Sequence, residues 1–318
     1  SWKISSTING TSQNAFQIIA SSEKNLLNEN KADIWNSGKN PSAESNLIQW
    51  LGKKLNPGTL CYWKVRIWNQ DDKVSEWSKP SFFSVGLINK SDWQAAYIGF
   101  QAESEYCLSP QLRKTFAIND KIGHFLLHVN SLGYHEVWLN GEKAGDNVLA
   151  PAVSQFNKRS LTVTYDISSL VRKGRNDLVL WIGQGWYSKG LPGVAGDGPL
   201  VKAQIERING NDREIQVVTD PSWAGRASGY STMGTWRPHQ FGGELVEGSL
   251  LLPDLSPASL DNASWSPVKT TEVPDHEVTP QMTEPNRIME AFKAETITAL
   301  QDNVWLIDMG KTLTGWFS

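Results

Sequence analysis

His124 and His128 have the four-residue spacing of a metal-ligand pair. That spacing brings two imidazoles together on a helix, but four residues of extended strand span about 13 Å. The neighbouring residues alternate between polar and apolar types, which indicates a strand with an exposed histidine face. His135 opens the stretch His-Glu-Val-Trp-Leu, which lacks the second histidine of a zinc-protease helix. The histidines therefore predict no metal site.

Acidic residues and glycines are equally uninformative about catalysis. The chain has 33 aspartates and glutamates, but no spacing pairs two of them as an acid and a base. Gly183 and Gly185 lack the third glycine and the strand–helix context of a nucleotide-binding loop. We expect no catalytic residue within positions 1–318.

Tryptophan is the chemically informative residue type. The chain contains 15 tryptophans, and each offers a flat apolar face with one hydrogen-bond donor, which suits stacking on a sugar ring. Large β-sandwich cores also use tryptophan. We therefore expect most of these side chains inside the protein and a minority at a binding surface.

Composition restricts the classes of protein. A length of 318 residues predicts two or three domains. The formal net charge of −3 is made of scattered charges of both signs, so nucleic acid is not an expected partner. Apolar runs are far shorter than the roughly 20 residues of a membrane span. No signal peptide is visible in the sequence.

Alternating residues between turn signals predict an all-β protein. In 62–68, Trp63, Val65 and Ile67 take one face of a strand and the residues between them take the other. Further strands are predicted at 123–129, 134–139 and 178–182. Asn140-Gly141 follows the second of these and is typical of a tight hairpin turn, because both residues tolerate positive φ.

Residues 1–88 resemble the fibronectin type III-like sandwich that opens bacterial α-L-rhamnosidases of glycoside hydrolase family 78. The stretches that carry the resemblance are NAFQIIASS, IWNSGK and TLCYWKVRIWNQDDKVSEWS. Phe16 and Asn36 are small departures from the family pattern. The resemblance implies a β-sandwich as the first domain.

Residues 93–268 resemble the β-jelly roll of the same family, which is related to carbohydrate-binding module family 67. The matching stretches are GYHEVWLNGEKAGDNVLAP, YDISSLVRKGRNDLVLWIGQGWY and GDGPLVKAQI. Residues 275–318 resemble the start of a further β-sandwich, which in the family precedes an (α/α)6 catalytic barrel. The resemblance implies that this barrel lies outside the 318 residues.

The resemblance places a sugar site on the jelly roll. In rhamnose-binding modules, an acidic and an amide residue after the Asn-Gly turn bind sugar hydroxyls and calcium, and Asp146 and Asn147 stand at that place. Trp186 and Tyr187 are expected to form the apolar wall, and Asp197 to close the site. Calcium is the expected cofactor, with Asp146 and Asn147 as its ligands.

One part of the binding pattern is missing. The family has a second amide ligand where this chain has Gly193-Val194-Ala195. A structural alternative therefore stays open, in which Asp146 and Asn147 only terminate a strand, as these residue types often do.

These observations give one leading hypothesis and two alternatives. The resemblance implies accessory domains of a glycosidase that removes terminal α-L-rhamnosyl residues with inversion; the parent protein is then an enzyme and this chain alone is not. The expected partners are a rhamnose-containing glycan and the protein's own C-terminal barrel, and the expected location is periplasmic or secreted. The alternatives are a stand-alone lectin-like module and a purely structural scaffold.

Overall fold

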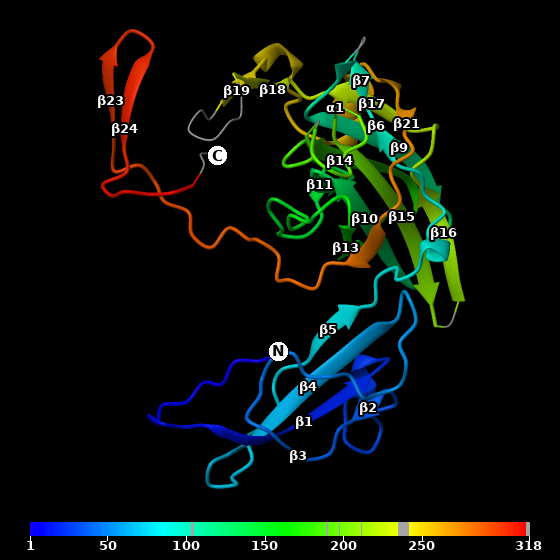
Figure 1. Cartoon of the computed structure of the whole chain (residues 1–318), viewed down its shortest axis with the longest axis vertical. Coiled ribbons are helices and arrows are strands. Elements are labelled where there is room, and N and C mark those ends of the chain that lie inside the picture. The colour runs from blue at the N-terminus through cyan, green and yellow to red at the C-terminus, as the bar shows by residue number, and fades with distance from the viewer. Residues whose placement is uncertain (103–104, 189, 197, 211, 235–241, 316–318) are drawn as a thin grey trace.

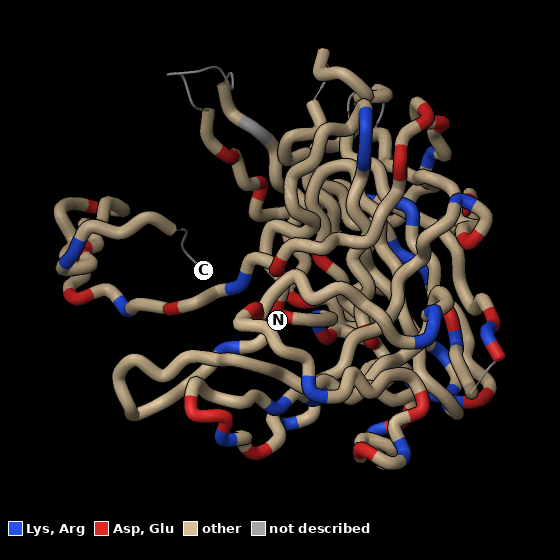
Figure 2. Tube along the Cα trace, turned by 60° about the horizontal axis from the view of Figure 1, so that its bottom comes forward, with Lys and Arg blue, Asp and Glu red and all other residues tan. Residues whose placement is uncertain are grey.

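The computed structural model describes residues 1–102, 105–188, 190–196, 198–210, 212–234 and 242–315. Its elements are almost all β-strands, which confirms the predicted fold class (Figure 1). A first unit is followed by a larger one built from two sheets. Charges of both signs are interspersed along the described chain (Figure 2).

The first unit is a five-stranded sheet of order β2-β1-β4-β5, with β3 also paired to β1. Its strands are β1 (Gln13–Ser21), β2 (Trp35–Asn36), β3 (Asn40–Pro41), β4 (Leu60–Asn69) and β5 (Ser81–Ser84). The alternation predicted in 62–68 is present, because Val65 is buried with Trp63 and Ile67 packed in the same cluster. On the other face the Arg66 guanidinium stacks between Trp68 and Trp77.

Two sheets form the larger unit. The first has the order β21-β6-β15-β10-β13-β22, with β16 paired to β15, and the second has the order β12-β11-β14-β9-β17-β20. The strands of the first sheet are β6 (Ile98–Gly99), β10 (His124–Leu132), β13 (Arg159–Asp166), β15 (Leu200–Asn209), β16 (Asp212–Val218), β21 (Lys269–Thr270) and β22 (Glu277–Pro280). Those of the second are β9 (Pro110–Ile118), β11 (Tyr134–Leu139), β12 (Glu142–Lys143), β14 (Gly174–Gly183), β17 (Ala224–Ala227) and β20 (Ser266–Pro267).

The main core lies between these two sheets. Phe125, Leu127 and Val129 of β10 face it from one sheet, and Leu178 and Leu180 of β14 face it from the other, all without solvent exposure. This is the period of two that an alternating strand requires. The turn between β11 and β12 has positive φ at both residues predicted for it, Asn140 at 56° and Gly141 at 88°.

The outer face of the first sheet is covered by the linker between the two units. Leu87 of the linker is fully buried, and the Gln204 side chain donates to the Asp92 carbonyl at 3.0 Å. His128 therefore has no exposure, and its Nδ1 contacts the Thr164 hydroxyl at 2.9 Å. The exposed histidine face predicted from the sequence is wrong for His128, because a segment distant in sequence covers it.

The C-terminal part of the chain adds one strand to the larger unit and then extends away from that unit. β22 pairs in parallel with β13, from Arg159 opposite Glu277 to Thr162 opposite Pro280. The sequence assigns the segment 277–280 to a third unit, but in the structure it is a strand of the larger, second unit. A long connection then leads to a separate hairpin of β23 (Thr296–Gln301) and β24 (Val304–Asp308) (Figure 1).

The remaining elements are short. They are β7 (Gln101–Ala102), β8 (Glu105–Tyr106), β18 (Tyr230–Met233), β19 (Gly243–Val246), the helix α1 (Pro257–Asn262) and three 3-10 turns at Lys24–Leu26, Lys90–Asp92 and Gly248–Leu250. The helix α1 begins with Ser256 as its N-cap, whose hydroxyl accepts a hydrogen bond from the Ser259 amide.

Candidate functional site

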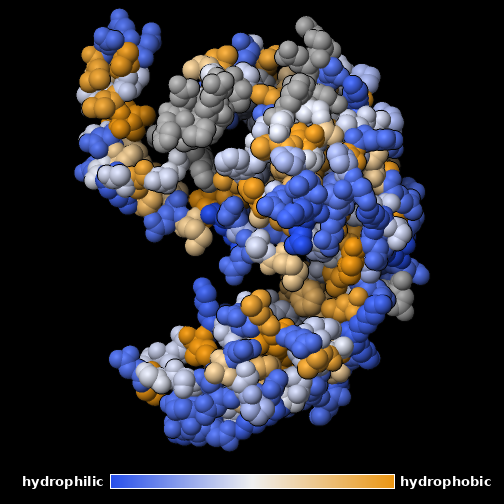
Figure 3. Space-filling view, viewed as in Figure 1, coloured by the Kyte–Doolittle hydropathy of each residue, from blue (hydrophilic) through white to orange (hydrophobic). Residues whose placement is uncertain are grey.

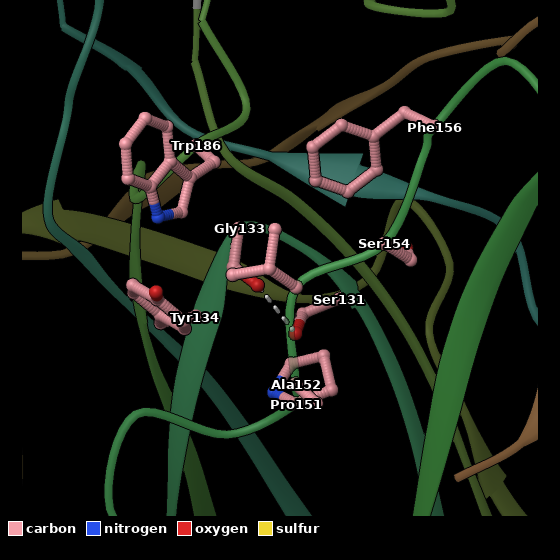
Figure 4. Close-up of a pocket in the computed structure, with 9 residues that line it drawn as sticks. Ser131, Gly133, Tyr134, Pro151, Ala152, Ser154, Phe156 and Trp186 are labelled. Atoms are coloured by element: carbon pink, nitrogen blue, oxygen red, sulfur yellow. Dashed lines mark hydrogen bonds between the residues drawn. The ribbon is translucent and has the colours of Figure 1, made fainter.

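A shallow pocket lies on the larger unit, where the β10–β11 turn meets two other loops. It has about 240 Å³ of space, including space open to solvent. Its lining residues are Ser131, Gly133, Tyr134, Pro151, Ala152, Val153, Ser154, Phe156 and Trp186. In Figure 4 the rings of Trp186 and Phe156 flank the pocket. The site therefore combines an aromatic rim with a small floor.

None of the nine lining residues carries a charge. Aromatic and aliphatic side chains supply apolar surface, while the hydroxyls of Ser131, Tyr134 and Ser154 supply hydrogen-bonding groups. Trp186 is 62% exposed, so its face is available to a ligand. Such a surface suits a neutral molecule with both C–H and hydroxyl faces, which describes a sugar.

Two glycines allow the backbone to build this pocket. Gly133 has φ 112°, and a Cβ there would lie 2.3 Å from the Gly183 carbonyl oxygen. Gly185 has φ 50°, and a Cβ there would lie 2.7 Å from the Tyr134 ring. Any other residue at either position would push the β10–β11 turn away from the loop that carries Trp186.

A chain of buried polar groups runs inward from the pocket. The Ser131 hydroxyl is 2.6 Å from His135 Nδ1, and His135 Nε2 is 3.0 Å from the Tyr165 hydroxyl. The Asn147 side chain contacts the same hydroxyl and partly offsets the effect of burial, which raises the pKa of Tyr165. The pocket is therefore connected to Asn147 through three buried side chains.

The charge state of His135 limits the direction of these hydrogen bonds. Complete burial lowers the pKa of His135 to about 3, so the imidazole is neutral near pH 7. A neutral imidazole donates from one ring nitrogen and accepts at the other. One of the two hydroxyls, Ser131 or Tyr165, therefore donates to His135, and the other accepts from it.

The structure separates the two aromatic residues predicted to form the sugar wall. Trp186 lines the pocket, whereas Tyr187 is fully buried in a cluster with Tyr97, Leu132 and Leu200. The Tyr187 hydroxyl accepts from the Ala195 amide at 2.7 Å. Tyr187 supports the pocket from inside and cannot form its wall, which corrects its predicted role.

Asp146 and Asn147 lie beside the pocket, and a residue far along the chain holds them. The Asp146 carboxylate pairs with Arg287 Nε at 2.8 Å, and Arg287 lowers the pKa of Asp146. Asn147 forms an isolated backbone bridge with Arg287. The Asp146 side chain is 70% exposed, so the ion pair lies at the surface.

Of the remaining predicted positions, one lies outside the described residues and the others take part in packing. Asp197 lies outside the described residues. Where the family pattern has an amide ligand, a Cβ at Gly193 would lie 2.3 Å from the Asn157 nitrogen, and Val194 packs beside Tyr187. This stretch therefore packs against the pocket loops.

The donor set does not fit calcium. Calcium takes six to eight oxygen ligands, whereas Asp146 and Asn147 offer three side-chain oxygens, and the carboxylate already faces a guanidinium. Among the described residues, no three His, Cys, Asp or Glu side chains cluster closely enough to hold a metal ion. Calcium binding by Asp146 and Asn147 therefore stays a prediction.

Sequence reasoning missed most of the pocket. The lining comes from three separate segments, represented by Tyr134, Phe156 and Trp186. Arg287 is about 140 residues from its partner in sequence (287 minus 146 is 141). The glycines at 133 and 185 were the available local signal, because each allows a close approach between loops.

Two family models match the chain. Residues 120–290 match the α-L-rhamnosidase N-terminal domain, and residues 1–89 match the Rha78A-like N-terminal immunoglobulin domain. The chain belongs to the α-L-rhamnosidase N-terminal domain family. The resemblance to rhamnosidase accessory domains is thereby confirmed.

Curated relatives of this rhamnosidase N-terminal region are full-length proteins named α-L-rhamnosidase. One from Formosa agariphila is 27% identical over 99% of this chain and 36% of the relative. A second from the same organism is 31% identical over 86% of this chain and 30% of the relative. One from an Alteromonas species is 28% identical over 99% of this chain and 35% of the relative. The chain thus spans about a third of the length of these relatives.

Solved structures share the fold. The α-L-rhamnosidase from Dictyoglumus thermophilum matches 98% of this chain and 36% of its own, with 27% identity and a TM-score of 0.74. The Streptomyces avermitilis α-L-rhamnosidase complexed with L-rhamnose matches 98% of this chain and 46% of its own, with a TM-score of 0.76 at 19% identity. The second likeness supports the fold alone. In the described part of the chain, no helix has the length and hydrophobicity to cross a membrane.

Proposed function

We propose that these domains serve an α-L-rhamnosidase that hydrolyses terminal α-L-rhamnosyl residues with inversion, and that the pocket beside Trp186 binds the rhamnose end of the glycan. The relatives' names support the first part of the proposal. The chain spans about a third of its curated relatives, which supports a longer parent protein. The proposal includes a C-terminal catalytic barrel as the partner of these domains and a periplasmic or extracellular location.

The observation that carries the sugar-binding part is the exposed Trp186 ring above an uncharged pocket. L-Rhamnose is a neutral deoxy-sugar whose methyl group and ring C–H groups need apolar contacts. Val153 and Pro151 can contact the methyl group. The Ser154 hydroxyl, which donates its own proton to the Arg159 carbonyl at 2.8 Å, can accept a hydrogen bond from a sugar hydroxyl. The pocket is shallow, so a terminal sugar would lie on the surface against the Trp186 ring and not inside an enclosed cavity.

Isothermal titration with L-rhamnose tests this proposal. We expect the chain to bind, and Trp186→Ala to weaken binding at least tenfold, which is about 1.4 kcal/mol, because the stacking surface is removed. Trp305→Ala is the matched control, since Trp305 is 63% exposed but lies on the β23–β24 hairpin. Equal affinities of the two variants would exclude the pocket as the sugar site.

A structural scaffold is the alternative that this titration also examines. Two features favour this alternative, because both serve packing alone. Leu87 of the linker is fully buried, and the Arg66 guanidinium stacks on Trp68. If the folded chain gives no heat with L-rhamnose, its role is to position the barrel.

A further inference from the structure

Two segments distant in sequence run side by side next to the pocket. The pocket loop, residues 146–152, leads into the pocket lining at Pro151 and Ala152. The second segment, residues 281–287, comes directly after β22 and runs along the pocket loop. We call it the strap. Val148 donates its amide to the Asn286 carbonyl at 3.0 Å, and Ala152 donates its amide to the Gln281 side chain at 2.9 Å. The strap thus holds the pocket loop at both ends.

The strap is itself well anchored. β22 pairs with β13 immediately before it, and the Gln281 amide donates to the Thr162 carbonyl at 2.9 Å. The side chain of Gln281 also donates to the Thr283 carbonyl at 3.2 Å. The start of the strap is therefore fixed to the main sheet, while its other end, at Asn286 and Arg287, contacts the pocket loop.

Arg287 brings a positive charge to the place where the resemblance expects a cation. Its guanidinium is 2.8 Å from the Asp146 carboxylate, and its backbone bridges Asn147. A calcium ion bound to the same carboxylate would lie close to the guanidinium, and like charges at that separation repel. Arg287 supplies charge neutralisation and loop fastening together, which are the two structural tasks of a bound cation.

The fastened loop is connected to the pocket by hydrogen bonds as well as by the backbone. Asn147 contacts Tyr165, and Tyr165 reaches Ser131 of the pocket lining through His135. A shift of Asn147 would therefore change the hydrogen bonds available to the Ser131 hydroxyl. The position of the strap determines the geometry that a ligand meets.

We propose that Arg287 acts as a built-in cation for this sugar site, so that the site is assembled without calcium. Arg287 is a positioning residue, because it acts through Asp146 and the pocket loop and does not line the pocket. The inference rests on the proposed sugar site for its binding consequences. Its structural consequences, the order of the pocket loop and its indifference to calcium, do not depend on sugar.

The test titrates the protein with L-rhamnose in calcium chloride and in chelator, using the wild type, Arg287→Gln and Arg287→Lys. We expect equal wild-type affinity in both buffers and at least tenfold weaker binding by Arg287→Gln in chelator. Arg287→Lys should recover part of the affinity, because it keeps the charge. Arg159→Gln is the control, since Arg159 forms an exposed pair with Glu277 at the start of β22, and it should bind as the wild type does.

Hydrogen exchange of the pocket loop gives a readout that needs no sugar. The Val148 and Ala152 amides should exchange faster in Arg287→Gln than in the wild type, and calcium should not raise the melting temperature of the wild type. Loss of wild-type rhamnose binding in chelator, stabilisation of the wild type by calcium, or unchanged exchange in Arg287→Gln would each overturn the inference. Absence of rhamnose heat with faster exchange and no calcium effect would refute the proposed sugar site and leave the role of Arg287 in fastening the pocket loop in place.

Discussion

His135 is a neutral imidazole that links the pocket lining to the protein interior by hydrogen bonds. It contacts one hydroxyl through each ring nitrogen, Ser131 through Nδ1 and Tyr165 through Nε2. A charged imidazole would have to donate to both partners, and Tyr165 would then have to direct its own proton elsewhere. The buried hydrogen bonds therefore favour a neutral His135 imidazole throughout the pH range in which an ordinary histidine changes its charge.

This neutrality predicts a pH-dependent stability. The pKa of His135 falls from 6.5 to about 3 on folding, so between these values the unfolded state binds a proton that the folded state excludes. The free energy of unfolding should therefore decrease as the pH is lowered through this window, by about 1.4 kcal/mol per pH unit from this group. His135→Gln lacks this contribution, so its deficit relative to wild type should shrink between pH 7 and pH 4. Urea unfolding of both proteins at each pH measures it, and a deficit independent of pH would contradict the assignment.

Single residues also mark how far the sequence alone could reach. Asn140 and Gly141 predicted their turn correctly, because the positive φ values are a local property of those residue types. Trp186 and Tyr187 could not be told apart, because they lie in a loop without a regular period. Which of the two faces solvent depends on the cluster around Leu200, and that cluster is assembled from separate parts of the chain.

At the scale of elements, the strands β15 and β16 carry two ion pairs of different character. Glu206 of β15 is completely buried and pairs with Arg213 of β16, whose Nε lies 2.5 Å away. Burial raises the pKa of Glu206, but His128 and Arg213 outweigh it and hold the pKa at about 2. Arg207 of β15 pairs with the exposed Glu214 of β16 at 2.7 Å. The same strand pair thus holds one buried and one surface charge pair.

Removing the arginine from each pair should have very different costs. Arg213→Ala leaves the Glu206 carboxylate buried without its main counter-ion and should lower the free energy of unfolding by about 3–5 kcal/mol. Arg207→Ala removes an arginine from the surface pair and should cost about 0–1 kcal/mol. Denaturant melts of the two variants measure the contrast. Similar losses in both would show that Glu206 is better solvated than its burial indicates.

The elements also explain which predictions succeeded and which failed. Strands such as 134–139 were predictable, because alternation is written into consecutive residues. The burial of His128 was not predictable, because the linker lies against Thr164 and Gln204, the neighbours of His128 on the two adjacent strands. The parallel pairing of β22 with β13 was missed for the same reason, since four residues of strand carry no signal of a partner more than a hundred positions earlier.

At the scale of the whole molecule, the hairpin of β23 and β24 stands apart from both units with apolar side chains in solvent (Figure 3). Ile297 is paired opposite Ile307, and Ala299 opposite Trp305, so these four share one face. The exposures of Ile297, Trp305 and Ile307 are 61%, 63% and 48%. An apolar strand face of this kind promotes association between molecules.

Breaking that face should reduce self-association without changing the stability of the main units. Ile307→Lys places a charge in the centre of the face, so we expect less concentration-dependent oligomer in sedimentation velocity and an unchanged melting temperature. Thr298→Lys is the control, because Thr298 lies on the opposite face of the hairpin. Equal association by both variants and the wild type would show that this face does not mediate contacts.

The position of the strap along the chain also has a consequence for biosynthesis. The pocket loop ends at residue 152 and the strap at residue 287, a difference of 135 residues. At translation rates of about 5–20 residues per second, roughly 7 to 27 seconds separate the emergence of the two segments from the ribosome. During that interval the nascent sheets can form while the loop beside the pocket has no partner. The site can thus be completed only after the strap has emerged, so the pocket loop of a nascent chain stays unfastened throughout this interval.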